Sequence, residues 1–250
     1  MTQEVAIVTG SAQGVGLGIA TVYARAGALV VGCDRQAAPD SLARLSNYHH
    51  VEADLITDGA AKRIVDACVE RHGRLDTLVN NAGVGNGQPF EKTTQEDFKR
   101  FHEINVTALI ECCRHALPHL KRSHGSIVNI SSAFGLVGAA QSAGYVPTKY
   151  AVVGITRMLA TEYGRDGVRI NAVAPGLIHS PGTAQRIASN AWWHRMMIEG
   201  APLGRVGQPE EIGEACLFLS SPKAGFITGV VLPVDGGWSV AKFLPNPDFA

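Results

Sequence analysis

The 250-residue sequence carries no net charge, because its 22 Lys and Arg residues are balanced by 22 Asp and Glu residues. A broad basic surface for nucleic acid and a polybasic membrane anchor are therefore not expected. No apolar run approaches the roughly 20 residues of a membrane-spanning helix. The opening stretch MTQEVAIVTG shows a strand pattern and no secretory signal. These absences favour a cytoplasmic protein that binds neither nucleic acid nor membrane.

Cysteine is scarce, and its spacing follows no metal-binding pattern. The five residues are an odd number and match no zinc motif, so reduced and partly buried thiols are expected. His115 and His119 could share a helix face, but Pro118 lies between them and no carboxylate completes a ligand set. We therefore expect no metal site.

Apolar runs alternate along the chain with amphipathic stretches. Strands are predicted at 4–9, 28–34, 48–55, 75–83, 125–131, 168–175 and 229–235. Helices are predicted at 14–27, 60–73, 94–120, 145–164 and 207–220, with a looser segment at 176–206. Nearly continuous apolar strands separated by helices are typical of a parallel sheet covered on both faces. The predicted fold is a single α/β domain over residues 1–250, a doubly wound, Rossmann-type parallel sheet of about seven strands.

The first predicted strand runs into a glycine-rich loop, TGSAQGVG at residues 9–16. A strand, a glycine loop and a helix in this order are typical of dinucleotide binding, because the glycines allow close backbone approach and the helix offers its first amides to a pyrophosphate. The residues predicted to hold the pyrophosphate are Gly10, Gln13, Gly14, Val15 and Gly16.

The second predicted strand ends at Asp34, about twenty residues after the loop. A carboxylate at this point accepts hydrogen bonds from the adenosine ribose and repels a 2′-phosphate. Arg35 follows and could instead hold that phosphate. Asp34 and the neutral Gln13 favour NAD over NADP.

Taken in order, the motifs resemble those of the short-chain dehydrogenase/reductase family over nearly the whole chain. The motifs are TGSAQGVG, Asp34, ADL at 53–55, NNAG at 80–83, IN ending at Asn105, NISS at 129–132, Tyr145 with Lys149, PG at 175–176, and TGVVLPVDGG at 228–237. Each is weak alone, and the ordered set is specific.

The resemblance implies a catalytic set of Asn105, Ser132, Tyr145 and Lys149. Tyr145 would be the general acid/base, and a nearby lysine ammonium, helped by the positive nicotinamide of the oxidised cofactor, would lower the tyrosine pKa from its usual value of about 10. Positions i and i+4 of one helix give that proximity. Ser131 and Ser132 would face opposite ways on a strand, and the family spacing of thirteen residues before the tyrosine selects Ser132 to bind the substrate oxygen. Asn105 would hold a water behind Lys149.

The same resemblance assigns further contacts to the cofactor. Asp54 and Leu55 would flank the adenine, and Asn81 and Gly83 would border the adenosine ribose. Lys149 would hold the nicotinamide ribose. The remaining predicted contacts are Pro175, Gly176, Ile178 and Ser180. Ser180 stands where the family often has a threonine that contacts the carboxamide, and Thr183 is the alternative.

The stretch AGYVPTKY at 143–150 also departs from the family, which usually has small residues where this chain has Pro147 and Thr148. A proline in a helix interior costs about 3 kcal/mol, whereas in the first turn its missing N–H has no partner to lose. We therefore predict a helix that begins at or just before Tyr145, so that Tyr145 and Lys149 stay on one face.

Substrate residues are predicted less sharply than cofactor residues. Residues from about 179 to 205 lie where the family has a substrate lid, and they contain Trp192, Trp193, Met196 and Met197. These side chains either pack against the domain or a neighbouring subunit, or form an apolar roof over the substrate together with Phe134. Arg186 and Arg195 are expected to be solvated. Members of the family are frequently homotetramers, and their C-terminal tails commonly pack at subunit interfaces. The resemblance therefore implies a homotetramer, with the tail at 239–250 at an interface.

The predicted function is oxidoreduction between NAD(H) and a secondary alcohol or ketone, apolar or cyclic, with Tyr145 as general acid/base. An NADPH-dependent 3-oxoacyl-carrier reductase is an alternative that the family also contains, although Asp34 disfavours it. A dinucleotide-binding sensor without catalysis is a further alternative, and the complete catalytic set disfavours it.

Overall fold

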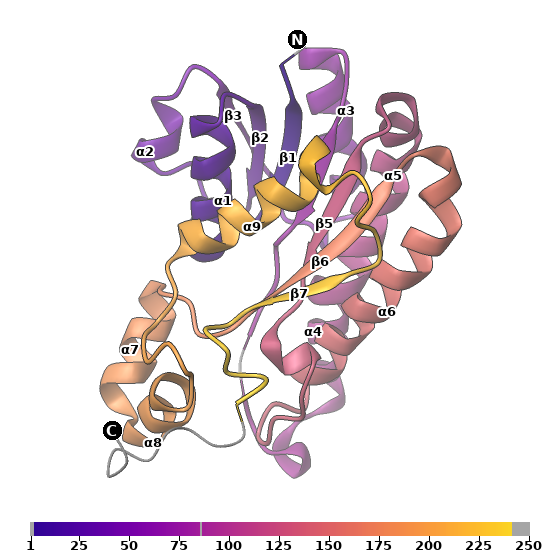
Figure 1. The fold of residues 1–250 in the computed structure, drawn as a ribbon. Coiled ribbons are helices and arrows are strands. Elements are labelled where there is room, and N and C mark those ends of the chain that lie inside the picture. The colour runs from indigo at the N-terminus through magenta and orange to yellow at the C-terminus, as the bar shows by residue number, and fades with distance from the viewer. Residues whose placement is uncertain (1–2, 86, 242–250) are drawn as a thin grey trace.

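A computed structural model describes residues 3–85 and 87–241, and its centre is one parallel sheet of seven strands (Figure 1). The strand order is β3-β2-β1-β4-β5-β6-β7. The strands are β1 (Val5–Thr9), β2 (Leu29–Asp34), β3 (Tyr48–Glu52), β4 (Thr77–Asn80), β5 (Ser126–Ile130), β6 (Arg169–Pro175) and β7 (Val231–Val234). Each falls within a predicted run, and the Rossmann-type fold is confirmed.

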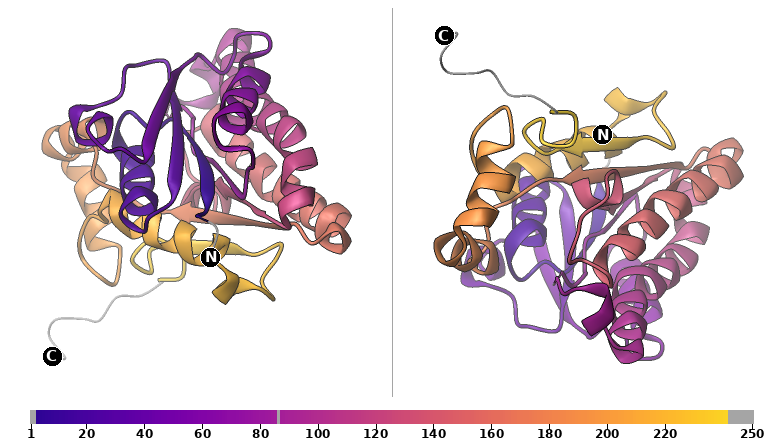
Figure 2. Two further views of the ribbon diagram at one scale, coloured as in Figure 1. Left: turned by 90° about the horizontal axis from the view of Figure 1, so that it is seen from above. Right: turned by 90° about the horizontal axis from the view of Figure 1, so that it is seen from below.

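Helices cover both faces of the sheet, as the doubly wound fold predicts (Figure 2). The helices are α1 (Gly14–Arg25), α2 (Asp40–Ala43), α3 (Ala60–His72), α4 (Gln95–His102), α5 (Ala108–Ser123), α6 (Tyr145–Tyr163), α7 (Pro181–Ser189), α8 (Ala191–His194) and α9 (Pro209–Ser220). On one face α1 packs against α9, and on the other α3, α5 and α6 lie side by side.

Two apolar layers fix the helices to the sheet, because successive residues of each strand point to opposite faces. Ile7 of β1 packs beneath α3 and α5, whereas the next residue, Val8, packs beneath α1 and α9. Tyr23 and Ile212 are fully buried in the second layer. Each such side chain stabilises the fold by roughly 1.5–3 kcal/mol, so the strand ends that carry the loops are held rigidly.

The structure differs from the sequence prediction in three places. The helix predicted at 94–120 is two helices, α4 and α5, joined by a π turn at Glu103–Thr107. The looser segment at 176–206 contains α7, α8 and a second π turn at Arg195–Glu199. The short helix α2 was not predicted, because four residues carry too little periodicity to be recognised.

The five cysteines are free and buried. Burial raises the pKa of Cys33, Cys68 and Cys113 to about 12. These three thiols therefore stay protonated at neutral pH and are unsuited to act as nucleophiles. Among the described residues no helix is long and apolar enough to cross a membrane, and no cluster of three or more ligand side chains is placed to hold a metal.

Candidate active site

A cleft of about 1060 Å³ opens at the carboxyl ends of the strands. It lies where the strand order reverses between β1 and β4, which is where open α/β sheets bind their ligands. The cleft brings together all but one of the predicted site residues: Gly10, Gln13, Gly14, Val15, Gly16, Asp34, Arg35, Asp54, Leu55, Asn81, Gly83, Ser132, Phe134, Tyr145, Lys149, Pro175, Gly176, Ile178, Ser180, Trp192, Trp193, Met196 and Met197. The exception is Asn105.

The glycine loop forms a cradle of backbone at one end of the cleft. A Cβ on Gly16 would overlap the carbonyl oxygen of Gly10, so the tight turn requires glycine there. The α1 N-terminus has no side-chain cap and no acidic residue in its first turn. Its first amides and its positive dipole end therefore suit a pyrophosphate. Asn81 lies behind the loop, where its side-chain amide donates to the carbonyls of Thr9 and Gly10.

Asp34 is held at the rim of this cradle by two backbone amides. Its carboxylate accepts hydrogen bonds from Ala12 N at 3.1 Å and from Gln36 N at 3.0 Å. Arg35 is exposed and Asp34 is half-buried. A fixed carboxylate here repels a 2′-phosphate and retains lone pairs for ribose hydroxyls. The residues present therefore fit a nicotinamide dinucleotide.

Helix α6 begins at Tyr145, so Pro147 is its third residue, in the first turn. This agrees with the helix start that was predicted from the proline. Tyr145 and Lys149 share a face, with the lysine Nζ 5.5 Å from the centroid of the tyrosine ring. The Lys149 ammonium donates to the carbonyl of Ile130 at 2.9 Å, where the cleft meets β5.

Burial shifts the pKa values of both members of this pair. Burial raises the pKa of Tyr145, and a hydrogen bond from Ser132 only partly offsets that rise. Burial lowers the pKa of Lys149 to about 8. Burial is the largest influence on the phenol here, and the Lys149 ammonium bonds to the Ile130 carbonyl. A lowering of the tyrosine pKa by Lys149 together with the positive nicotinamide stays a prediction.

The two adjacent serines have different partners. Ser131 donates its hydroxyl hydrogen to the Lys149 carbonyl at 3.0 Å, which ties β5 to α6. Ser132 accepts a hydrogen bond from Phe134 N at 3.1 Å and interacts with Tyr145. Ser132 is therefore the serine placed beside the tyrosine, as the spacing predicted.

Asn105 lies in the π turn between α4 and α5 and is buried behind the cleft. Its side-chain amide pairs with the backbone of Val84, accepting from the N–H at 2.8 Å and donating to the carbonyl at 3.0 Å. It also donates to the Thr148 hydroxyl at 3.0 Å. Asn105 therefore joins the loop after β4 to the first turn of α6.

Ser180 and Thr183 both reach the cleft, at the start of α7. The Ser180 hydroxyl caps the helix by accepting from Thr183 N at 3.2 Å, and the Thr183 hydroxyl donates to the Ile178 carbonyl at 2.7 Å. Because the two hydroxyls also contact each other at 3.0 Å, the structure does not separate their roles.

Residues 179–205 form a segment over one end of the cleft (lower left in Figure 1). Its base is closed by a bridge between Ile178 and Gly207. Met197 is buried against Phe134, whereas Trp192 keeps 58% of its surface exposed. Trp193 and Met196 pack partly buried against the same cluster. The segment thus presents an apolar surface to the cleft.

Comparison with known proteins gives a family. A family model described as enoyl-(acyl carrier protein) reductase, within the short-chain dehydrogenase/reductases, matches residues 10–239. The chain is 41% identical to the L-fucose dehydrogenase of Oryctolagus cuniculus, over 94% of this chain and 84% of the relative. It is 37% identical to the cis-4-hydroxycyclohexanecarboxylate dehydrogenase of Sinomonas cyclohexanicum, over 95% of this chain and 97% of that one.

The protein belongs to the short-chain dehydrogenase/reductase family. It is an oxidoreductase of the secondary-alcohol class. The crystal structure of Cj0485 dehydrogenase superposes with a TM-score of 0.92 at 31% identity, covering 98% of both chains.

Solved structures of similar dehydrogenases contain either cofactor. A 3-ketoacyl-(acyl-carrier-protein) reductase from Brucella melitensis, complexed with NADH, has a TM-score of 0.86 and 32% identity, covering 95% of this chain and 98% of that one. ElxO with NADP bound has a TM-score of 0.88 and 30% identity, covering 95% and 99%. The chain therefore belongs to a family that binds nicotinamide dinucleotides of both kinds.

Sequence reasoning missed several residues that line this dehydrogenase's cleft. Trp238 donates from Nε1 to the Met196 carbonyl at 2.8 Å, and its ring centroid lies 5.5 Å from that of Phe134. Its position just after the last strand was the available signal, because that places it at the carboxyl edge of the sheet. Arg186, expected to be solvated, is half-buried and lines the cleft with Asn190.

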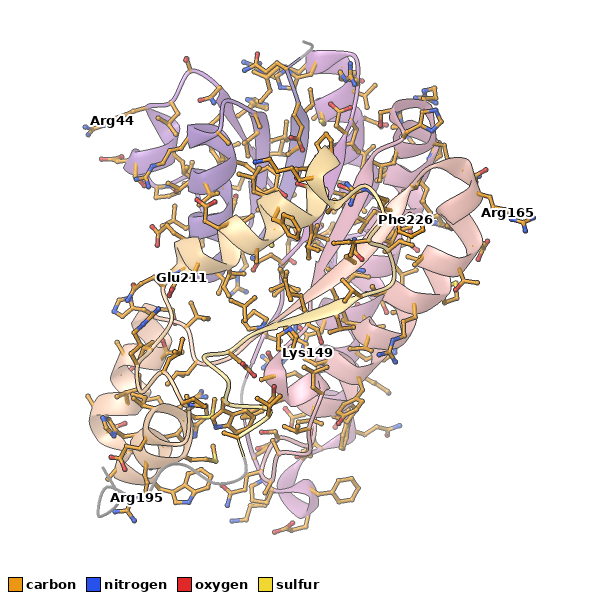
Figure 3. The ribbon with its side chains drawn as sticks, in the orientation of Figure 1. Arg44, Lys149, Arg165, Arg195, Glu211 and Phe226 are labelled. Atoms are coloured by element: carbon orange, nitrogen blue, oxygen red, sulfur yellow. The ribbon has the colours of Figure 1, made fainter. Side chains whose placement is uncertain are left out.

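Arg195 is exposed, as expected, and points away from the body of the molecule (Figure 3). Residues 242–250 of the predicted tail lie outside the residues that the structure describes.

Proposed function

We propose that the protein transfers a hydride between NAD(H) and a cyclic secondary alcohol or its ketone, with Tyr145 as general acid/base. The observation that carries this proposal is the joining of the glycine cradle, Asp34 and the Tyr145–Lys149–Ser132 group in one cleft. A nicotinamide dinucleotide would supply the hydride acceptor; the loop at Gly10–Gly16 would hold its pyrophosphate, and Asp34 would bind its adenosine ribose.

The protein's own groups move and hold the proton. Ser132 fixes the substrate oxygen by hydrogen bonding and stabilises the charge that develops on it. Tyr145 removes the hydroxyl proton during oxidation and returns it during reduction. Because burial raises the pKa of Tyr145, the phenolate needs nearby positive charge. The Lys149 ammonium, with its pKa lowered to about 8, remains largely protonated at neutral pH and supplies it.

Asp34 supports NAD as the cofactor. Two backbone amides fix its carboxylate at the rim of the cradle, so a 2′-phosphate would meet a negative charge that cannot move away. Arg35 is exposed and lies on the same rim, and it is the residue that favours NADP. A fixed charge outweighs a solvated one at the same site, because water screens the latter.

The apolar lining supports a ring as the substrate skeleton. Phe134, Trp193, Met196, Met197 and Trp238 surround the end of the cleft under residues 179–205. Two aromatic rings in tilted contact suit a flat or cyclic apolar body. The similar cis-4-hydroxycyclohexanecarboxylate dehydrogenase is named for a substrate that contains such a ring. In this proposal residues 179–205 are a lid over the substrate.

A carrier-bound 3-oxoacyl chain is a second candidate substrate, supported by the similar 3-ketoacyl-(acyl-carrier-protein) reductase. The neutral net charge of the chain disfavours an acidic carrier as partner. We place the dehydrogenase in the cytoplasm as a homotetramer, in keeping with its five free thiols and the habit of the family. Light scattering tests the tetramer.

The deciding experiment follows the absorbance of reduced nicotinamide with NAD or NADP and a panel of cyclic, aromatic and linear secondary alcohols. Turnover with NAD that disappears in Tyr145→Phe supports the proposal. Preference for NADP would show that Arg35 outweighs Asp34. Reduction of 3-oxoacyl thioesters faster than any ketone would favour the second candidate. Dinucleotide binding without turnover of any substrate would indicate a sensor.

A further inference from the structure

One face of α7 carries polar side chains into the apolar end of the cleft. Thr183, Arg186 and Asn190 are spaced by three and four residues and all line the cleft. Thr183 and Arg186 share one face of α7, and Asn190 is the residue that follows the helix. Ile187, the neighbour of Arg186, packs into the apolar cluster of Phe134 and Met197. The lid therefore brings a cation and an amide to the same cleft that contains Tyr145.

The Arg186 guanidinium is positioned by an aromatic ring and has no acid to neutralise it. Its central carbon lies 5.0 Å from the centroid of the Trp193 ring. Within residues 3–85 and 87–241 no carboxylate forms an ion pair with it. A guanidinium that stacks on a ring keeps the N–H donors in its plane free for hydrogen bonding. The residue is thus half-buried, charged and ready to accept an anion.

We propose that Arg186 binds a carboxylate of the substrate, so that the enzyme acts on a ring-shaped secondary alcohol that bears a carboxylate. This inference rests on the proposed dehydrogenase function and adds the substrate's charge. A carboxylate matches the planar donors of arginine in a two-bond contact, and the apolar surroundings of Trp193 and Met196 strengthen that contact by excluding water.

The cofactor phosphates are the other source of an anion in this cleft. The α1 amides already provide for the pyrophosphate, and Asp34 lies where the adenosine ribose is bound. Arg186 instead shares a ring contact with Trp193, whose side chain belongs to the apolar roof. Its neighbours thus place it in the substrate half of the cleft.

The test measures binding without turnover, by calorimetry of the NAD complex with two unreactive probes, cyclohexanecarboxylate and cyclohexanecarboxamide. The wild-type protein should bind the carboxylate roughly 10- to 100-fold more tightly. Arg186→Gln should remove that preference, and Arg186→Lys should keep part of it. Arg195→Gln, an exposed arginine of the same segment, is the matched control and should leave the preference intact. Circular dichroism and the NAD affinity of each variant verify the fold.

Two outcomes would overturn the inference. One is equal affinity of the wild-type protein for the two probes. The other is a loss of NAD affinity in Arg186→Gln with the carboxylate preference unchanged, which would assign Arg186 to a cofactor phosphate. A carboxylate preference that depends on Arg186 in a protein that oxidises no alcohol would support the anion site and contradict the proposed function instead.

Discussion

The side-chain amide of Asn105 donates a hydrogen bond to the hydroxyl of Thr148, 3.0 Å away, across the junction between the π turn and α6. The same hydroxyl donates to the carbonyl of Tyr145 at 2.6 Å. A buried chain of two hydrogen bonds thus connects Asn105 to the backbone of the proposed catalytic tyrosine. Thr148 thereby ties Asn105 to the first turn of α6.

Replacement of Thr148 should test this connection. Thr148→Val keeps the shape and leaves one buried Asn105 N–H without an acceptor, a loss of about 1–3 kcal/mol. We expect kcat to fall about 10-fold or more, with little change in the KM for NAD, because the tyrosine is displaced and the cofactor cradle is not. Thr148→Ser retains the hydroxyl and should stay close to wild type. Equal kcat in the two variants would show that the Thr148 hydroxyl does not position Tyr145.

Lys149 should lower the free energy of unfolding at neutral pH, because its ammonium group is buried, although turnover requires it. Burial lowers its pKa from the usual 10.5 to about 8, which corresponds to roughly 3 kcal/mol of destabilisation when the group is protonated. Lys149→Met should therefore abolish turnover and raise the free energy of unfolding at pH 7 by about 2 kcal/mol, once the lost bond to Ile130 is allowed for.

The stability difference between the wild-type protein and Lys149→Met should depend on pH. Between pH 8 and 10.5 the unfolded chain binds a proton that the folded chain has lost, so wild-type stability rises relative to Lys149→Met as pH increases. Urea unfolding should show that the difference in free energy of unfolding between Lys149→Met and the wild-type protein is smaller at pH 10 than at pH 7. Lys223→Met, at an exposed lysine, should show no such change. A gap that is constant with pH would mean that the lysine titrates normally.

The cofactor preference should depend on the charge of Asp34. Asp34→Asn leaves amide and carbonyl groups for the loop and removes the repulsion of a 2′-phosphate. We expect the ratio of kcat/KM for NAD to that for NADP to fall by about 10-fold or more, since like charges at an interface cost up to several kcal/mol. Asp40→Asn, at an exposed aspartate of α2, is the control. An unchanged ratio would locate cofactor selection elsewhere.

Two glycine substitutions should have opposite effects. Gly16→Ala places a Cβ against the Gly10 carbonyl, so we expect loss of dinucleotide binding and a lower unfolding temperature. Gly154→Ala lies within α6 with no atom within 4 Å of the new Cβ, and it should stabilise the protein by about 0.5–1 kcal/mol. Calorimetric unfolding with and without NAD separates the two. Retained NAD binding in Gly16→Ala would contradict the proposal that the glycine loop binds the dinucleotide.

Some features follow from local sequence alone. Strands such as β1 and β2 were predicted because they are short apolar runs, and burial on both faces leaves few other ways to place such a run. The start of α6 followed from Pro147, because a proline costs least in the first turn of a helix. The spacing that selected Ser132 also agrees with the structure, since Ser131 bonds instead to the Lys149 carbonyl.

The remaining features depend on contacts between distant segments. The pKa of Tyr145 reflects burial by the whole cleft, and the π turn at Asn105 forms where its amide meets Val84. The position of Arg186 depends on how α7 lies over the cleft, which periodicity cannot reveal, because a charged residue on a short helix normally faces water. The sequence by itself determined the sheet, the glycine cradle and the order of the proposed catalytic residues. Only the tertiary structure decided which charges face the cleft, because that depends on the packing of loops whose contacts are far apart in the chain.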